Sequence, residues 1–174
     1  HATYNGDHGR IGKLQTHEFD AVGHIPFIMA HPTLAHGERR SQLVQLVDIY
    51  PTVLAAVERP LPAQDAERPL HGVNLLPVLE DAETATRDYA VYGQFGKSVS
   101  ITDGTWVLHQ SPVPENQPLY WYGYYLSKFM NYDLGHYVHG RRPVIACASW
   151  PTPTWLSHKP QDINELHNLV DEEP

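Results

Sequence analysis

The chain has 174 residues, of which 41% are hydrophobic and 18% charged, a composition typical of a globular protein with a real core. Its formal net charge of −8 excludes a typical nucleic-acid binder, because neutralising phosphates needs a basic surface. The single cysteine, Cys147, allows no internal disulfide. No apolar run reaches the roughly 18 residues of a membrane-spanning helix.

A polar cluster stands almost at the start of the chain. The stretch YNGDHGRIGK covers residues 4–13 and contains Asp7, His8 and Lys13. A strand of normal length leading into this cluster would begin upstream of His1. We therefore expect residue 1 not to be a natural N-terminus, and the chain to be the second part of something larger.

The segment after this cluster predicts one strand and two short helices. The apolar run IPFIMA at 25–30 predicts a buried strand. Apolar residues at helical spacing over 41–57 predict a helical turn and then a second helix. Ser41 is the expected N-cap of the first, and Asp48 caps the second, with Pro51 in its first turn.

The rest of the chain predicts a smaller antiparallel unit. A Pro-rich connection over 58–69 indicates a subdomain boundary, and one helical turn is expected near 75–79. Strands are expected at 89–92, 98–101, 105–109 and 144–147. The Asp103-Gly104 pair is a strong hairpin signal between two of them. The acidic tail 158–174 is expected to wrap the surface.

The N-terminal cluster has the chemistry of a metal and anion site. Asp7 offers a hard oxygen ligand, and His8 a nitrogen ligand or a proton donor, so together they suit a divalent cation. Lys13 would carry positive charge toward an anionic substrate. His17, four residues later, faces the same side if the segment is helical. Read singly, the same residues also fit a solvated turn, a surface charge and a structural histidine.

The order of motifs resembles the sulfatases of the alkaline phosphatase superfamily. The chain carries, in series, YNGDHG, GK with His17, HIPFIMAHP, LVQLVDIYPTVLAAV and HGVNLLPVLED. Its tail DINELHNL resembles the closing motif of that family through Asp162, Glu165, Asn168 and Leu169. The resemblance implies an α/β, alkaline-phosphatase-like fold. Residues 1–60 would be the C-terminal part of the main core, and 61–174 a smaller antiparallel-sheet subdomain with a helix.

The resemblance also implies roles for single residues. Asp7 and His8 would be metal ligands, with calcium the first expectation and manganese or magnesium the alternatives. Lys13 would contact the anionic ester oxygens, and His17 would be a second catalytic residue. The substrate would be a sulfate ester of a small molecule or a sugar.

One departure from the family pattern limits this prediction. The formylglycine nucleophile of the family comes from Cys or Ser followed by x-Pro-x-Arg, and Cys147 lacks both the Pro and the Arg. We expect the nucleophile upstream, so the N-terminal part of the same protein is the expected partner and this chain alone is expected to be inactive. Two alternatives stay open: a phosphodiesterase or phosphonate monoester hydrolase of the same superfamily, and a non-catalytic metal-binding or interaction module.

Overall fold

The computed structural model describes most of the chain, with gaps. The described residues are 3–12, 17–33, 37–64, 67, 69–93, 98–111, 113, 119–121, 142–144 and 153–172. Within them the strands are β1 (Tyr4–Asn5), β2 (Ile11–Gly12), β3 (Ala90–Gly93), β4 (Val99–Thr102), β5 (Trp106–Gln110), β6 (Leu119–Trp121), β7 (Arg142–Val144) and β8 (Trp155–His158). The α-helices are α1 (Asp20–Gly23), α2 (Ile49–Ala56) and α3 (Leu76–Glu80), and the 3₁₀ turns are η1 (Asp7–Gly9) and η2 (Leu46–Asp48).

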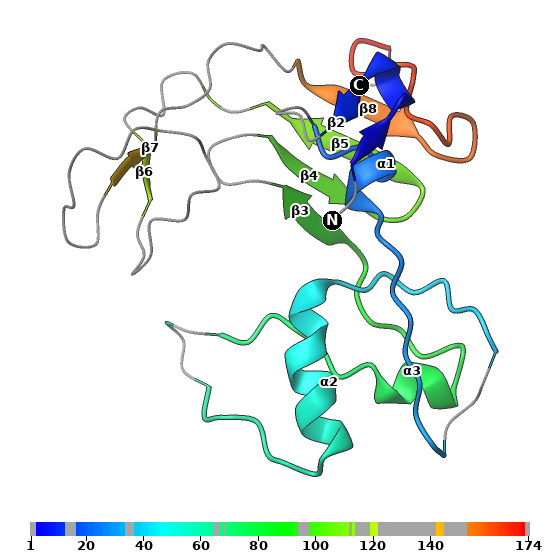
Figure 1. The fold of residues 1–174 in the computed structure, drawn as a ribbon, viewed down its shortest axis with the longest axis vertical. Helices are drawn as coiled ribbons and strands as arrows, with labels where there is room; N and C mark the ends of the chain where they lie inside the picture. The colour runs from blue at the N-terminus through cyan, green and yellow to red at the C-terminus, as the bar shows by residue number, and fades with distance from the viewer. Residues whose placement is uncertain are drawn as a thin grey trace.

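The largest element is an antiparallel sheet in the order β3-β4-β5-β8, beside the two-stranded pairs β1-β2 and β6-β7. Figure 1 shows the four-stranded sheet and the N-terminal β1, β2 and α1 in one part of the molecule, and α2 and α3 in another. The predicted mixture of helices with an antiparallel sheet is confirmed. The alkaline-phosphatase-like arrangement and the division at residue 60 stay predictions.

The β4–β5 hairpin forms where the sequence predicts it. Oδ1 of Asp103 accepts hydrogen bonds from the backbone N–H groups of Thr105 at 2.8 Å and Trp106 at 2.7 Å. These two bonds hold the pKa of Asp103 below its usual range. Gly104 has φ of +92°, which only a residue without a Cβ adopts readily. The local chemistry of the turn therefore sets the register Thr102↔Val107.

The sheet is unusual in burying polar side chains on its inner face. Ser100 and His109, which are cross-strand partners, are both 0% exposed. Val99 and Ile101, which alternate with them on β4, are 50% and 40% exposed. Buried polar groups persist only when they are hydrogen-bonded, so this face must contain a connected polar network.

The fourth strand, β8, is absent from the predictions, and the last predicted strand is only partly described. β8 pairs with β5 in the register Val107↔Ser157. The structure places β7 at Arg142–Val144, and 145–147 lie outside the described residues. The tail after β8 folds back on it, and the backbone N–H of Leu169 donates to the carbonyl of Leu156 at 2.8 Å.

The predicted helical segment begins later than expected. Residues 41–45 are not helical, and the chain enters η2 only at Leu46, so Ser41 as an N-cap is wrong. Asp48 is the N-cap of α2 by position, but its side chain makes no cap bond to that helix. The buried carboxylate instead accepts from the N–H of Val73 at 2.9 Å and pairs with Arg87. These longer-range bonds tie η2 to Val73, which lies ahead of α3, and to Arg87, which lies ahead of β3.

The predicted buried strand at 25–30 is also wrong. The structure gives this segment no strand, and Ile28 is 89% exposed. A buried strand needs hydrogen-bonded neighbours, and none of the described residues pairs with it. Among the described residues no helix is long and apolar enough to cross a membrane.

Candidate functional site

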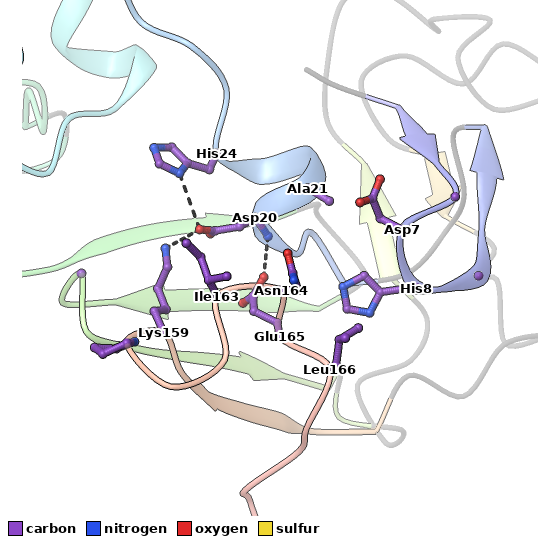
Figure 2. A pocket seen from close by; sticks show the side chains of 14 residues that line it. Asp7, His8, Asp20, Ala21, His24, Lys159, Ile163, Asn164, Glu165 and Leu166 are labelled. Atoms are coloured by element: carbon purple, nitrogen blue, oxygen red, sulfur yellow. Dashed lines mark hydrogen bonds and ion pairs between the residues drawn. The ribbon is translucent and has the colours of Figure 1, made fainter.

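An open groove of about 1020 Å³ lies between the N-terminal loop, α1 and the tail after β8. Figure 2 shows Asp7 and His8 along one side of it, and Asp20, His24 and Lys159 toward the other. Glu165 and its neighbours in the tail lie between the two sides. The groove thus collects charged and imidazole side chains from three segments far apart in the sequence.

The loop that carries Asp7 and His8 is tightly folded. Gly6, His8 and Gly9 have φ of 111°, 51° and 66°. Backbone N–H groups close the loop: that of Gly6 donates to the Arg10 carbonyl at 2.8 Å and that of Arg10 to the Asp7 carbonyl at 3.0 Å. A histidine in the left-handed region is uncommon, and such conformations persist where surrounding structure maintains them. The loop is therefore closed by its own backbone hydrogen bonds.

The two side chains of this loop have different surroundings. Asp7 is exposed, whereas the imidazole of His8 is half-buried and lies parallel to the ring of Phe19, with centroids 4.0 Å apart and planes 8° apart. Burial lowers the pKa of His8, and the charges of Glu165 and Asp7 oppose that shift. A lowered pKa favours the neutral imidazole, which is the form that binds metal ions.

The facing side of the groove is an ion-paired cluster around Asp20. Its Oδ2 lies 2.5 Å from Nζ of Lys159 and 3.5 Å from Nδ1 of His24. The backbone N–H of Asp20 donates to Oε2 of Glu165 at 2.5 Å. The positive charge of Lys159 is therefore already balanced by a carboxylate, and this side of the groove is held to the tail.

Behind the groove lies the polar network of the inner sheet face. Nε2 of His109 donates to Oε1 of Glu165 at 3.0 Å, and the hydroxyl of Ser100 lies 2.7 Å from Nδ1 of the same ring. Serine, histidine and acid occur in the order of a hydrolase triad. All three are 0% exposed, so substrate cannot reach the hydroxyl and the network is structural. Sequence reasoning picked out Glu165 through the closing motif but missed Ser100 and His109, because nothing local pairs them.

Of the two predicted catalytic residues, Lys13 and His17, the structure describes only His17. Lys13 lies outside the described residues. His17 is 3% exposed and stacks on His109 with ring centroids 5.2 Å apart. Its Nε2 donates to the carbonyl of Pro153 at 2.5 Å. The structure thus places His17 behind the groove among the buried rings, and its catalytic role stays a prediction.

Comparison with known proteins gives a consistent result. No family model matches the chain. Human arylsulfatase K is 33% identical over 93 residues, which are 51% of this chain and 16% of the relative. The dog protein of the same name is 35% identical over 80 residues, covering 43% and 14%, and the rat protein is 33% identical over 92 residues, covering 50% and 15%. This chain is related to the sulfatases. It spans only about one-sixth of the length of these relatives.

The relation confirms the sulfatase resemblance predicted from the motif series. Because the sulfatase resemblance implies Asp7 and His8 as metal ligands, the groove can be examined for its fit to a metal ion. Asp7 and His8 offer one carboxylate and one imidazole on a single loop, a donor pair that suits a divalent cation. No group of three or more His, Cys, Asp or Glu suited to holding a metal occurs among the described residues. The described part of the chain therefore supplies two donors, and a complete coordination shell needs others.

Proposed function

We propose that this chain is the C-terminal part of a sulfatase-like, metal-dependent hydrolase of sulfate esters. The similarity to three mammalian arylsulfatase K sequences over about half of the chain carries the proposal. The name of these relatives refers to aryl sulfates, and we take an aryl or sugar sulfate as the substrate class. The groove beside Asp7 and His8 is the part of this chain that would face the substrate.

In this proposal Asp7 and His8 hold part of a divalent metal site. Asp7 is exposed at the groove, and the lowered pKa of His8 favours the neutral imidazole that binds a metal ion. A bound calcium, manganese or magnesium ion would polarise the ester. Lys13 would contact the anionic ester oxygens and stabilise the charge that develops as the bond breaks. The formylglycine nucleophile would come from a preceding part of the protein.

The proposed partner of this chain is that preceding part of the same protein. The exposed side of α2 supports this partner, since Ile49, Val53 and Val57 recur at a spacing of four and are 40%, 54% and 58% exposed. Apolar side chains exposed at this spacing are a feature that protein interfaces share. The groove would then be completed by ligands and a nucleophile from the partner.

A metal titration tests the proposed donors on the chain itself. Calcium and manganese are added separately at millimolar concentrations while the melting temperature is followed. Binding to the folded state stabilises it, by about 2.7 kcal/mol when the ion is at 100 times its Kd. Asp7→Asn is expected to abolish the shift, and His24→Asn, a matched change on the other side of the groove, to leave it intact. No shift for either metal would favour the non-catalytic interaction module.

Activity is tested on the longer protein that contains this chain. Aryl sulfate and aryl phosphate esters are compared as substrates, and the sulfate ester is expected to be turned over faster. Lys13→Ala is expected to lower kcat about 100-fold, the loss typical of removing one group that stabilises transition-state charge. Faster turnover of phosphate diesters or phosphonate esters would select the related phosphodiesterase or phosphonate hydrolase activity instead. Turnover by the 174-residue chain alone would contradict the division of the site.

A further inference from the structure

Phe19 occupies a distinctive position between the sheet and the N-terminal loop. It is 5% exposed and immediately precedes α1. One ring face is parallel to the imidazole of His8, with centroids 4.0 Å apart and planes 8° apart. His8 is the only one of the described aromatic rings around Phe19 that meets it face to face. The contact joins a core residue to a side chain of the groove.

The other neighbours of Phe19 meet it edge to face and fix its plane. His109 lies 4.9 Å away at 74°, His17 5.5 Å away at 80°, and Trp155 5.6 Å away at 78°. Edge-to-face contacts at these distances are favourable and directional. His109 is itself held by Glu165 at 3.0 Å. The orientation of the Phe19 ring is therefore determined by the sheet and the tail.

The backbone of His8 needs such support. Its φ of 51° lies in the left-handed region, which is unfavourable for a residue with a Cβ. A parallel ring contact is favourable by an amount of the same order. The stack on Phe19 can thus stabilise the loop conformation and restrict the imidazole to one plane at the same time.

We propose that Phe19 is the positioning residue for His8. The sheet and the tail fix the plane of the Phe19 ring, and the imidazole of His8 stacks on that plane. His8 therefore lies in the groove in one rotamer, beside Asp7. The inference rests on the proposed function, in which His8 is a metal ligand. Residues that orient a ligand from behind contribute strongly to metal affinity, because a ligand already in place loses less freedom on binding.

The first experiment measures the orientation of His8 without any metal. Phe19→Leu removes the ring but keeps an apolar side chain, Phe19→Met is a second variant should the first not fold, and Phe19→Tyr keeps the ring. In the wild-type chain the His8 ring protons are expected upfield in the NMR spectrum, with contacts from one rotamer. The Leu and Met variants are expected to lose the upfield shift and average their rotamers, and the Tyr variant to retain both features.

A matched control separates positioning from general loss of stability. Val78→Ala removes buried volume from α3, away from the groove, and is expected to lower the melting temperature while leaving the His8 signals unchanged. If Phe19→Leu or Phe19→Met is folded and keeps the upfield shift and the single rotamer, Phe19 is an ordinary core residue and the inference is overturned.

The second experiment measures affinity for Mn²⁺ by calorimetry on the same variants. Phe19→Leu is expected to weaken binding about tenfold, as for other residues that orient a ligand, with Phe19→Tyr and Val78→Ala close to the wild type. Equal affinity in the wild type and Phe19→Leu would overturn the inference. His8→Ala, which removes the proposed ligand, is measured beside them. If neither the wild type nor any of the variants binds Mn²⁺, the proposed metal site is overturned instead, and the NMR result still decides the role of Phe19.

Discussion

His17 shows how burial changes what a histidine contributes. A sequence with Lys13 and His17 four residues apart predicts two groups on one side of a catalytic site. In the structure the imidazole of His17 is packed between His109 and Phe19 and bonded to the Pro153 carbonyl. Burial lowers its pKa below the ordinary 6.5, against the effect of the Pro153 bond, which raises it. The folded state therefore favours the neutral ring.

This shift predicts an acid-sensitive fold. Because the folded pKa of His17 is lowered, the unfolded chain takes up its proton first as the pH falls, near 6.5. The stabilisation is fully present above that pH and is lost as the pH falls from 6.5 toward the folded pKa; His8, also lowered, acts in the same direction. Urea unfolding is expected to show a smaller free energy at pH 5.5 than at pH 7.5, with a smaller difference in His17→Asn.

His24 provides the control for that measurement. Its side chain is 76% exposed, so His24→Asn is expected to keep the pH dependence of the wild type. A His17→Asn variant with the full wild-type difference between the two pH values would show that His17 does not contribute to the acid sensitivity.

At the scale of elements, the closing motif acts as a clamp on β8. Oδ1 of Asn168 accepts from the backbone N–H groups of Leu156 at 2.9 Å and Val170 at 3.2 Å. Its Nδ2 donates to the Thr154 carbonyl at 2.9 Å. The side chain thus takes the place of a neighbouring strand along the outer edge of β8 and satisfies backbone groups that the sheet leaves open.

Removing this clamp is expected to destabilise the chain. Asn168→Ala leaves the Leu156 N–H and the Thr154 carbonyl without their bonds, which costs about 2 kcal/mol. Urea unfolding measures the loss, and hydrogen exchange at the Leu156 amide is expected to accelerate. Asn168→Asp keeps the acceptor oxygen, so its free energy of unfolding should lie between those of the wild type and Asn168→Ala. Asn164 is an exposed neighbour in the tail, and Asn164→Ala should change the free energy of unfolding little. Unaltered protection of Leu156 in Asn168→Ala would rule the clamp out.

The elements that were predicted correctly from the sequence are those specified by interactions between residues close together in the chain. Asp103-Gly104 defines its hairpin through bonds within four residues, and the spacing around Pro51 locates α2. β8 was missed because its pairing with β5 and its clamp by Asn168 depend on residues far along the chain. The inner face of the sheet also depends on contacts distant in sequence. Hydrophobicity alone favours burial of Val99 and Ile101, whereas the structure buries Ser100 and His109 on the opposite face. The bonds of His109 to Glu165 and Ser100 make that burial possible.

The candidate site divides in the same way. Asp7 and His8 were predictable because both lie on one short loop, and the structure places both along the groove. The stack of His8 on Phe19 and the cluster of Asp20 with Lys159 join segments that no local pattern connects. The metal-binding role of Asp7 and His8 stays a prediction until ion binding is measured.

At the scale of the whole molecule, α2 exposes apolar side chains on one side, within the part of the chain that the structure describes. Pro51 and Thr52 of α2 are buried, whereas Ile49 and Val53 of the same helix and its C-cap Val57 are exposed. Exposing an apolar helix face to water is unfavourable, so such a face tends to associate with another surface. The 174-residue chain is therefore expected to self-associate through α2 when its proposed partner is absent.

The double substitution Val53→Gln and Val57→Gln tests this expectation. Both side chains are more than half exposed, at 54% and 58%, so the free energy of unfolding should stay within about 0.5 kcal/mol of the wild type. Sedimentation velocity should shift toward the monomer, and binding of a hydrophobic dye should fall. Val91→Gln makes the same chemical change at a 45% exposed position on β3 and should affect neither measurement. If the double variant associates as strongly as the wild type, the interface lies elsewhere and α2 is not the surface on which the rest of the protein docks.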